Sequence, residues 1–572
     1  MKSGVKFTLF SHFLKRSTVK MKVFSIIILI LGLFLLPHLL IETWKSYNQK
    51  VTSIKQTWNL TVPYVVVHFD LKGVPPLLSY LRSTLQTLKD RGTTALLIEY
   101  EDMFPYEGIL VNLSAKNHYD KIELKRFLMS VEQIGLEIIP LVPTFGHLEF
   151  ALKLKEFQHL REHPKFPDSI CPSKKESQDL IREMLRQVIA FHRKVAPVKH
   201  IHVGCDEVHQ IKVCEICSKQ KSRKTSIILE HLKFINDVLG ELSPKTRILV
   251  WDDMLRDMHL EKSDDVKLPN MESVTWEYTT NFSIRPLISA LNQHQRMFGN
   301  LWVASAYKGA DGSTNTVPNL ENRFLNHIRW LNFIVQYGSV SIDYNFKGII
   351  LTGRARYSHM EPPCELLPVA FPSIVLNLIL IQKYHNGIAL CRENHTDKEY
   401  EATKERYLGY FITDDLNSAL MCQHTFFDGY LPSFETLTCA FEGVDLYVLL
   451  SKYADEKYIL TSRFYTDSDD TYGSKKDSRL DDFKLGYLNM EKLKDTLDFN
   501  IAMLRELTLS EAEMIESMIP YFDKYVIEEY ITFKLDKLKK YFYDSIQFLT
   551  EHYTVNDWPR RYSNSNIGVM AR

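Results

Sequence analysis

Two adjacent carboxylates, Asp206 and Glu207, are the residues of this chain whose types and spacing point most directly to chemistry. They lie in the segment HVGCDEVH (202–209), directly after a short apolar run. Because neighbouring residues at a strand end point in different directions, one carboxyl group can reach a leaving-group oxygen while the other holds a second group of the substrate. Acetal cleavage needs one group that protonates the departing oxygen and one that stabilises an oxocarbenium-like centre. Taken alone, such a pair is more often two solvated carboxylates in a loop.

A 2-acetamido sugar is a suitable substrate for such a pair. The carbonyl oxygen of its own acetamido group can act as the nucleophile. The enzyme then needs one acid/base group and one carboxylate that orients and stabilises the acetamido group. This chemistry requires no metal and no organic cofactor, and we expect neither.

Further polar and aromatic side chains follow other apolar runs of the chain. A mouth lined by carboxylates and aromatic rings suits a polyhydroxylated ligand with flat faces. Each of these residues also has an ordinary structural interpretation, since a lone histidine or tryptophan often packs in a core. The candidates for substrate binding are Asp70, Glu101, His147, Trp251, Trp276 and Tyr307.

The elements that must position these residues read as a parallel α/β barrel. Near-continuous apolar strands indicate burial on both faces, and eight of them alternating with helices predict a (β/α)8 barrel over residues 62–385. A doubly wound open sheet is the alternative. In a barrel the carboxyl ends of all strands meet at one mouth, so the candidate residues should converge there. The eight runs span residues 62–70, 94–102, 136–147, 198–207, 247–254, 272–278, 300–307 and 346–353.

The length and composition of the chain agree with a globular enzyme. The 572 residues include 70 Lys and Arg and 70 Asp and Glu, for a formal net charge of zero. This balance argues against a nucleic-acid partner, which usually requires a basic excess. Residues 365–384 read as an apolar helix that closes the barrel rather than a membrane span. Residues 386–572 read as a helix-rich region that either packs on the barrel or joins two chains in a homodimer.

The N-terminus predicts a membrane anchor. Residues 23–41 carry no charge and are close to the ~20 residues that span a bilayer. Residues 1–22 contain six basic residues and no acidic one, which places them in the cytosol as a short tail. Residues 42–61 would form a stem, and the chain would be a single-pass type II membrane glycoprotein of the secretory pathway, in the Golgi, with a lumenal catalytic domain. A signal peptide that begins at Met21 and is cleaved is the alternative.

A lumenal compartment permits disulfides among the eight cysteines. Their pairing does not follow from the sequence, but Cys214 and Cys217 are close enough to form a local bridge, which is the interpretation we favour. A zinc site would need two more ligands, and the chain has no second C-x-x-C segment.

The segment H-x-G-x-D-E after the fourth run resembles the catalytic signature of the family 20 glycoside hydrolases, the β-N-acetylhexosaminidases. The similarity extends from about residue 62 to about residue 385. Further segments resemble the hexosaminidase D-like branch of that family, namely HFDLKGVPP (68–76), EYEDMFPYEG (99–108), PTFGHLEF (143–150) and CELLPVAFPS (364–373).

The resemblance implies a role for each candidate residue. Glu207 would be the general acid/base, with a pKa raised by partial burial and by its neighbour Asp206. Asp206 would stay ionised, orient the acetamido N–H and stabilise the positive intermediate, with His147 supporting the pair. The acetamido pocket and the sugar face would be walled by Trp251, Trp276 and Tyr307, and sugar hydroxyls would be bound by Asp70 and Glu101.

One position departs from the related branch. Arg354 stands where that branch usually has a tryptophan beneath the sugar, and its guanidinium could instead hydrogen-bond or meet an acidic group of the substrate. We therefore predict a retaining exo-β-N-acetylhexosaminidase that removes terminal β-linked GalNAc, or GlcNAc, from glycans and glycoproteins. A membrane-tethered, non-catalytic glycan-binding protein on the same barrel is the alternative that Arg354 leaves open.

Overall fold

The structure is a computed structural model, which describes residues 62–256, 267–339, 344, 346–385, 413–422, 439–453 and 490–553. The predicted tail (1–22), anchor (23–41) and stem (42–61) lie outside the described residues. The expectations for those segments, and for the compartment that depends on them, stay predictions.

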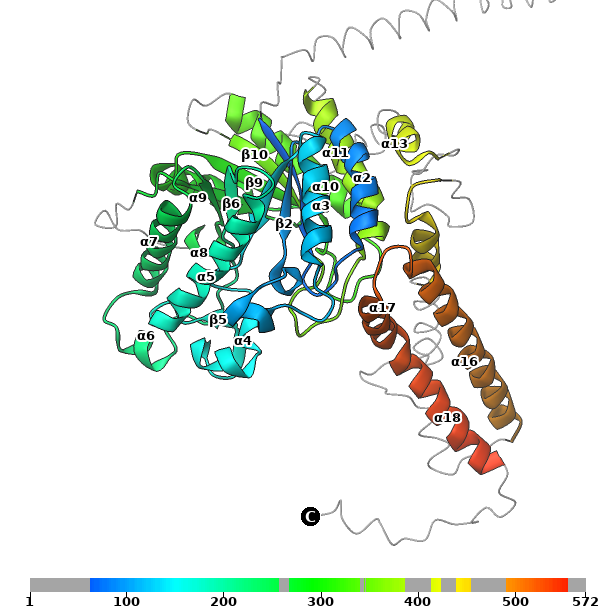
Figure 1. The fold of residues 1–572 in the computed structure, drawn as a ribbon. Coiled ribbons are helices and arrows are strands. Elements are labelled where there is room, and N and C mark those ends of the chain that lie inside the picture. The colour runs from blue at the N-terminus through cyan, green and yellow to red at the C-terminus, as the bar shows by residue number, and fades with distance from the viewer. Residues whose placement is uncertain are drawn as a thin grey trace, which may run out of the picture. The chain divides into compact units, whose positions relative to one another are not determined.

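Eight parallel strands close into a barrel (Figure 1). Around the barrel the strands follow the order β1-β10-β9-β8-β7-β6-β3-β2, and β2 pairs with β1 again. Val66 on β1, for example, lies opposite Ile350 on one side and Ala95 on the other. The predicted (β/α)8 barrel is confirmed, and the open-sheet alternative is wrong. The strands are β1 (Tyr64–Asp70), β2 (Ala95–Glu99), β3 (Glu137–Leu141), β6 (His200–His202), β7 (Arg247–Trp251), β8 (Met271–Trp276), β9 (Leu301–Lys308) and β10 (Phe346–Gly353).

The interior of the barrel is packed with apolar side chains from alternate strand positions, including Val66, Leu97, Leu249 and Trp302. The inward-pointing side chains fill the interior, so the barrel has a solid core and not a pore. The indole Nε1 of Trp302 donates to the buried carboxylate of Glu272 at 2.6 Å, so the largest interior ring also has its polar atom satisfied.

Helices cover the outside of the barrel (Figure 1). Each presents an apolar stripe to the strands, as in α5, where Leu180, Met184 and Val188 are buried at helical spacing. The principal helices are α2 (Leu78–Asp90), α3 (Lys121–Gln133), α5 (Lys175–His192), α7 (Lys224–Leu242), α9 (Ile284–Met297), α10 (Leu320–Ser339) and α11 (Leu367–His385).

Helix α11 is the apolar segment that could be mistaken for a membrane span. Among the residues that the structure describes, it is the helix whose length and apolar composition would suffice to cross a bilayer. It is instead almost entirely buried, and it packs against β9 and α10. The prediction that this segment closes the barrel is confirmed.

Two excursions from the barrel lie beside the mouth. The first follows β3 and contains α4 (Glu149–Leu152), the turn η3 (Lys155–Leu160) and the antiparallel hairpin β4–β5 (Arg161–His163 and Phe166–Ile170). The second follows β6 and ends in the short helix α6 (Glu215–Lys219).

The C-terminal region is helical where it is described, with Cys422 and Cys439 joined in a disulfide. Helices α16 and α18 pack against each other, and α17 and the π-helical turn η7 lie between them in sequence. Lys534 in η7 donates to the carbonyl oxygen of Thr314, a barrel residue, at 2.8 Å. This region therefore packs on the barrel, and the homodimer stays a prediction. Its elements are α13 (Thr413–Leu420), α16 (Met490–Met518), α17 (Lys524–Ile531), η7 (Thr532–Asp536) and α18 (Lys537–Tyr553).

Candidate active site

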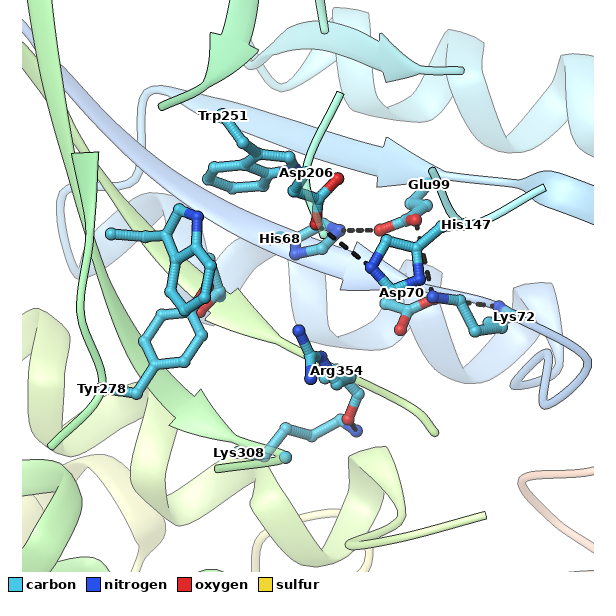
Figure 2. A pocket seen from close by; sticks show the side chains of 13 residues that line it. His68, Asp70, Lys72, Glu99, His147, Asp206, Trp251, Tyr278, Lys308 and Arg354 are labelled. Carbon is cyan, nitrogen blue, oxygen red and sulfur yellow. Dashed lines mark hydrogen bonds and ion pairs between the residues drawn. The ribbon is translucent and has the colours of Figure 1, made fainter. Parts of the chain in front are cut away.

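A pocket opens at the carboxyl ends of the barrel strands (Figure 2). The structure brings five of the predicted residues together here, namely Asp70, His147, Asp206, Trp251 and Trp276. The other lining residues were not among the predicted site residues, although four of them stand at ends of the predicted strands; they are His68, Lys72, Glu99, Tyr278, Lys308, Gly309 and Thr352. Arg354, singled out for its departure from the related branch, completes the lining.

The loop after β6 presents the two carboxylates through an unusual backbone. Cys205 and Glu207 both have positive φ angles, of 73° and 46°, which L-residues adopt only where the surroundings impose them. The N–H of Glu207 is held by the Oδ2 atom of Asp253 at 2.8 Å. On the other side, a Cβ atom at Gly146 would lie 2.1 Å from the carbonyl oxygen of Asp206, so only glycine lets the two loops approach.

His147 bridges the two carboxylates. Its Nε2 atom lies 3.3 Å from Oδ2 of Asp206 and 3.1 Å from Oε2 of Glu207. Burial by itself would lower the pKa of His147, but the charge of Asp206 and the hydrogen bonds to both carboxylates outweigh it and hold the pKa well above its ordinary value. An imidazolium between two carboxylates explains how both can stay in one small site.

Glu207 has a second cationic neighbour in Arg354. The Nη2 atom of Arg354 lies 3.5 Å from Oε2 of Glu207, and its guanidinium also covers the ring of Tyr357 at 5.0 Å. Burial raises the pKa of Glu207, but the bond from His147 and the charge of Arg354 outweigh it and bring the pKa well below its ordinary range. The predicted raised pKa of Glu207 is therefore wrong for this arrangement, because two cations, both remote in sequence, face the carboxylate.

An aromatic wall faces the carboxylates. The rings of Trp276 and Tyr278 are stacked with centroids 5.0 Å apart. The indole Nε1 of Trp276 donates to Oδ1 of Asp253 at 3.2 Å, so Asp253 connects this wall to the backbone of Glu207. Burial and the charge of Asp206 raise the pKa of Asp253 to about 7. Asp253 was not among the predicted site residues, although its place in the segment WDD at the end of β7 was a usable signal.

Asp70 lines the pocket and also connects β1, the first strand, to the segment after β10, the last strand of the barrel. Its Oδ2 atom accepts the N–H of Ala355, after β10, at 2.7 Å, and its Oδ1 atom accepts the N–H of Lys72 at 3.0 Å. Beside it, His68 contacts Glu99 at 3.0 Å. Carboxylates held by neighbouring donors thus line one side of the pocket.

Glu207 does not line this pocket but a second hollow beside it, and two further predicted site residues, Tyr307 and Glu101, line neither. Tyr307 is fully buried, its hydroxyl donates to the carbonyl oxygen of His68 at 2.9 Å, and its ring packs against Gly353. Glu101 is turned beneath the pocket by a positive φ of 47°, where it pairs with Lys72 at 3.3 Å. Both residues support the lining rather than form it. The prediction was wrong because the sequence at a strand end does not reveal which side chain points into the pocket.

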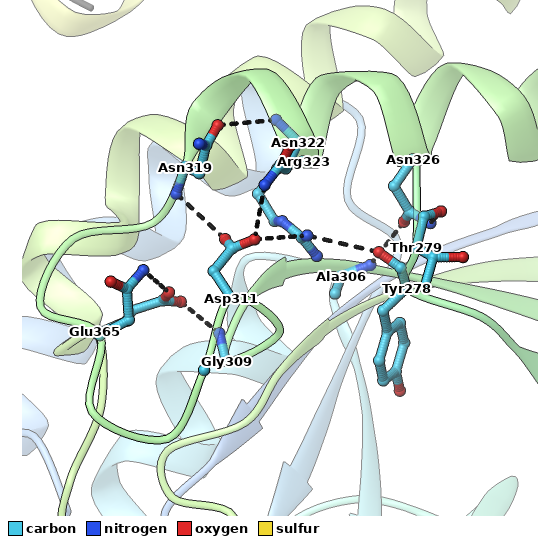
Figure 3. Close-up of polar contacts among 12 residues, drawn as sticks. Tyr278, Thr279, Ala306, Gly309, Asp311, Asn319, Asn322, Arg323, Asn326 and Glu365 are labelled. Atoms are coloured by element: carbon cyan, nitrogen blue, oxygen red, sulfur yellow. Dashed lines mark hydrogen bonds and ion pairs between the residues drawn. The ribbon is translucent and has the colours of Figure 1, made fainter. Parts of the chain in front are cut away.

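A polar network holds the aromatic wall from behind (Figure 3). Asp311 contacts Arg323 at 3.0 Å, and the same guanidinium group reaches the carbonyl oxygen of Tyr278 at 3.4 Å. The side-chain amide of Asn326 donates to the carbonyl oxygens of Glu277 and Thr279, both at 2.9 Å. The backbone on each side of Tyr278 is therefore fixed by side chains of helix α10.

A second, more open hollow adjoins the first. It shares His147 and Arg354 with the inner pocket, and its other lining residues include Glu207 and Tyr357. Asp206 therefore faces the inner pocket and Glu207 the outer hollow. This arrangement can place an acid/base group at the bond between a sugar in the inner pocket and a leaving group outside it.

A (β/α)8 barrel that gathers two carboxylates, a histidine and an aromatic wall at its mouth has the architecture of a glycoside hydrolase. No family model matches the chain. Over 319 residues the chain is 39% identical to Hexosaminidase D of Bos taurus, and the alignment covers 55% of this chain and 90% of that protein. With Hexosaminidase D of Homo sapiens the identity is 40% over 322 residues, covering 55% and 65%. The chain belongs to the hexosaminidase D family.

Two solved structures are similar to this chain at much lower identity. A β-N-acetylhexosaminidase from Bacteroides fragilis is 12% identical, with a TM-score of 0.42, and the match covers 61% of this chain and 71% of that one. Dispersin B is 14% identical, with a TM-score of 0.40, and the match covers 56% and 99%. The position of the site rests on the geometry of this chain and not on these likenesses.

Proposed function

We propose that this protein is a retaining exo-β-N-acetylhexosaminidase that removes terminal β-linked GalNAc or GlcNAc from glycans by substrate-assisted catalysis. The observation that carries the proposal is the division of the carboxylate pair between two hollows. Asp206 faces the inner pocket and Glu207 the outer one. Paired and hydrogen-bonded side chains such as Asp70, Lys72 and Glu99 line one side of the inner pocket, which favours a terminal sugar and cleavage from a chain end.

The inner pocket offers complementary surfaces for a 2-acetamido sugar. Trp251, Trp276 and Tyr278 supply apolar faces for the sugar ring and the acetamido methyl group. Asp206 would accept the acetamido N–H, which turns the acetamido carbonyl oxygen toward the anomeric carbon. Asp70 and Glu99 stand where hydroxyl groups would need acceptors.

The reaction then proceeds in two steps with Glu207 as the proton carrier. Glu207 donates its proton to the glycosidic oxygen as the acetamido oxygen attacks the anomeric carbon, and the leaving group departs as an alcohol. Asp206 stabilises the positive charge of the resulting oxazolinium ion. The Glu207 carboxylate next removes a proton from water, the water oxygen attacks the anomeric carbon, and two inversions give net retention.

Glu207 must gain a proton before the first step, although His147 and Arg354 hold its pKa low. A glycosidic oxygen that enters beside Glu207 separates the carboxylate from Arg354 and removes water from the site. The remaining burial then favours the neutral acid. We infer that substrate binding itself brings about the protonation of Glu207.

The test compares the full chain with Glu207→Gln and Asp206→Asn on chromogenic β-GalNAc and β-GlcNAc substrates. Loss of a general acid/base lowers the rate by about 10²- to 10⁴-fold. We expect the larger rate with GalNAc, in line with the lean of the hexosaminidase D-like branch. If the folded protein hydrolyses neither sugar between pH 4 and 8, the proposal fails.

The alternative is a tethered glycan-binding protein. The observation that favours it is the contact between Arg354 and Glu207, because an ion pair keeps Glu207 ionised and unable to donate a proton. Glu207→Gln separates the two proposals. A binding protein would keep its affinity for the sugar after this substitution and show no turnover before it.

We also propose that the enzyme is a type II membrane protein of the Golgi with a lumenal barrel. The uncharged run 23–41 and the basic residues before it support this orientation. Sequons at Asn112 and Asn281 supply a test, because both asparagines are exposed on the barrel. Glycans at these sites that Asn112→Gln and Asn281→Gln each remove would show lumenal exposure, and their complete absence in cells would contradict it.

A further inference from the structure

A cluster of side chains of metal-binding types lies beside the catalytic loop, the loop after β6 that carries Asp206 and Glu207, but does not line the pocket. Its members are Cys171, Cys214, Cys217 and Glu162, which come from the β4–β5 hairpin and from the start of α6. Three of them are completely inaccessible to solvent and Cys214 is 8% exposed. The Sγ atom of Cys171 lies 3.3 Å from that of Cys214 and 3.5 Å from that of Cys217. The four potential ligand atoms all lie within 4.8 Å of one another.

The carboxylate of Glu162 is half-satisfied. Its Oε1 atom accepts the N–H groups of Val213, at 2.6 Å, and Cys214, at 3.1 Å. Its Oε2 atom is buried and has no hydrogen-bond partner among the described residues. A buried carboxylate oxygen without a donor or a cation is costly, so this atom points to a missing positive charge.

A local disulfide between Cys214 and Cys217, which the sequence favoured, is not what the described residues show. All three thiols of the cluster are free. The N–H of Cys217 donates to Sγ of Cys214 at 3.2 Å, and the hydroxyl of Ser173 lies 3.2 Å from Sγ of Cys217. Donors aimed at sulfur are suited to thiolates, and a bridge between any two of the three would leave the third thiol and Glu162 unexplained. The two ligands that the sequence lacked are Cys171 and Glu162.

We propose that Cys171, Cys214, Cys217 and Glu162 bind a structural Zn²⁺ ion. Zinc takes four ligands in a tetrahedron with Zn–S distances of about 2.3 Å, which place sulfur atoms about 3.8 Å apart, close to the separations found here. Thiolates are soft ligands that select zinc over calcium or magnesium. The four side chains fill all four positions, so the ion would have no open site for a substrate.

The ion would act as a clamp on the catalytic loop. Glu207 is separated from Cys214 by only six residues, and the hairpin that carries Cys171 also contacts this loop, where the N–H of Gln210 donates to Ser169 at 3.4 Å. Tying the hairpin to α6 stabilises the positive-φ backbone that presents Asp206 and Glu207. The four ligands are therefore positioning residues.

The test begins with the metal content of the full chain, purified without chelator and exposed to Zn²⁺ alone. We expect about one zinc per chain, reduced about tenfold or more in Cys171→Ser and Glu162→Gln. Glu215→Gln is the matched control, because Glu215 is an exposed carboxylate on the same helix that pairs with Lys219. Its zinc content should equal that of the unaltered chain.

A second measurement does not depend on whether the variants fold. In the unaltered chain, thiol labelling followed by peptide mapping should find the three cysteines protected until a chelator removes the zinc, and then labelled together. A folded protein that takes up no zinc, or a disulfide joining any two of these three cysteines, would overturn the proposal. Neither measurement uses a substrate, so the outcome is independent of the hydrolase activity proposed above.

Discussion

Asp253→Asn should change how the stability of this enzyme depends on pH. Asp253 accepts the N–H of Glu207 through Oδ2 and the indole N–H of Trp276 through Oδ1. Burial and the neighbouring Asp206 raise its pKa from an ordinary value of 3.8 to about 7. Asparagine keeps the shape of the side chain but does not titrate in this range.

The expected size follows from that rise in pKa. At about 1.4 kcal/mol per pH unit, the difference between 3.8 and about 7 corresponds to about 4 kcal/mol. Asp253 is partly exposed, so solvent screening reduces this to about 2 kcal/mol. For a barrel of ~320 residues with an unfolding entropy near 2.1 cal/mol/K per residue, that is about 3 °C in Tm.

The sign follows from the protonation of the folded and unfolded chains. Below about pH 4 the carboxyl is protonated in both states, and its favourable contribution is complete. As the pH rises through about 7, the folded state must carry an unfavourable charge, and this contribution is lost. The Tm of Asp253→Asn minus that of the unaltered chain should therefore rise by about 3 °C between pH 4 and pH 8. The substitution also weakens one of the two hydrogen bonds, which adds a destabilisation that does not vary with pH.

The assay is thermal unfolding of both proteins in matched buffers across that range. Asp179→Asn is the control, because Asp179 is an exposed carboxylate that pairs with Lys175 on helix α5. A difference in Tm that stays constant from pH 4 to 8 would refute the reasoning, since it would mean that Asp253 does not take up a proton in this range.

Three further substitutions test other parts of the site. Arg354→Met should raise the pKa of Glu207, because the positive charge beside the carboxylate is lost. Glu207 then keeps its proton to higher pH, and the basic limb of the pH profile of kcat/KM should move up by roughly one pH unit. An unmoved limb would show that Arg354 does not act on Glu207. Gly353→Ala should lower the unfolding free energy by about 1–3 kcal/mol in denaturant titrations, because the new Cβ would lie 2.1 Å from the ring of Tyr307; unchanged stability would contradict this packing. Tyr307→Phe should cost about 1 kcal/mol of stability through the lost bond to His68 and leave KM unchanged, whereas a large rise in KM would return Tyr307 to the substrate site.

The barrel could be predicted because burial on both faces leaves a continuous signal in the sequence. Each of the eight apolar runs overlaps one barrel strand, and α11 was recognised because its apolar run follows the eighth strand. The carboxylate pair was found for a similar reason, since it directly follows a strand and is contiguous in the chain.

What the sequence concealed depends on residues far apart along the chain. Arg354 meets Glu207 across the mouth of the barrel, and Cys171 reaches Cys214 from the β4–β5 hairpin. No local spacing connects such pairs. The positions of Glu101 and Tyr307 were concealed for another reason, because one positive φ angle or one step along a strand decides whether a side chain faces the substrate or the core.

The bond between Arg356 and helix α17 shows that residues beyond the barrel support the active site. Both Nη atoms of Arg356 contact the carboxylate of Glu529, at 2.7 and 2.8 Å, and Arg356 lies two residues after Arg354. The segment that contains Arg354, the cation beside Glu207, is thus held by helix α17. This helix begins more than a hundred residues after the barrel ends at residue 385. A fragment trimmed at residue 385 would contain every residue that lines the pocket and yet lack the external support of one of them. The smallest unit that preserves the active site therefore extends beyond the barrel, through helix α17.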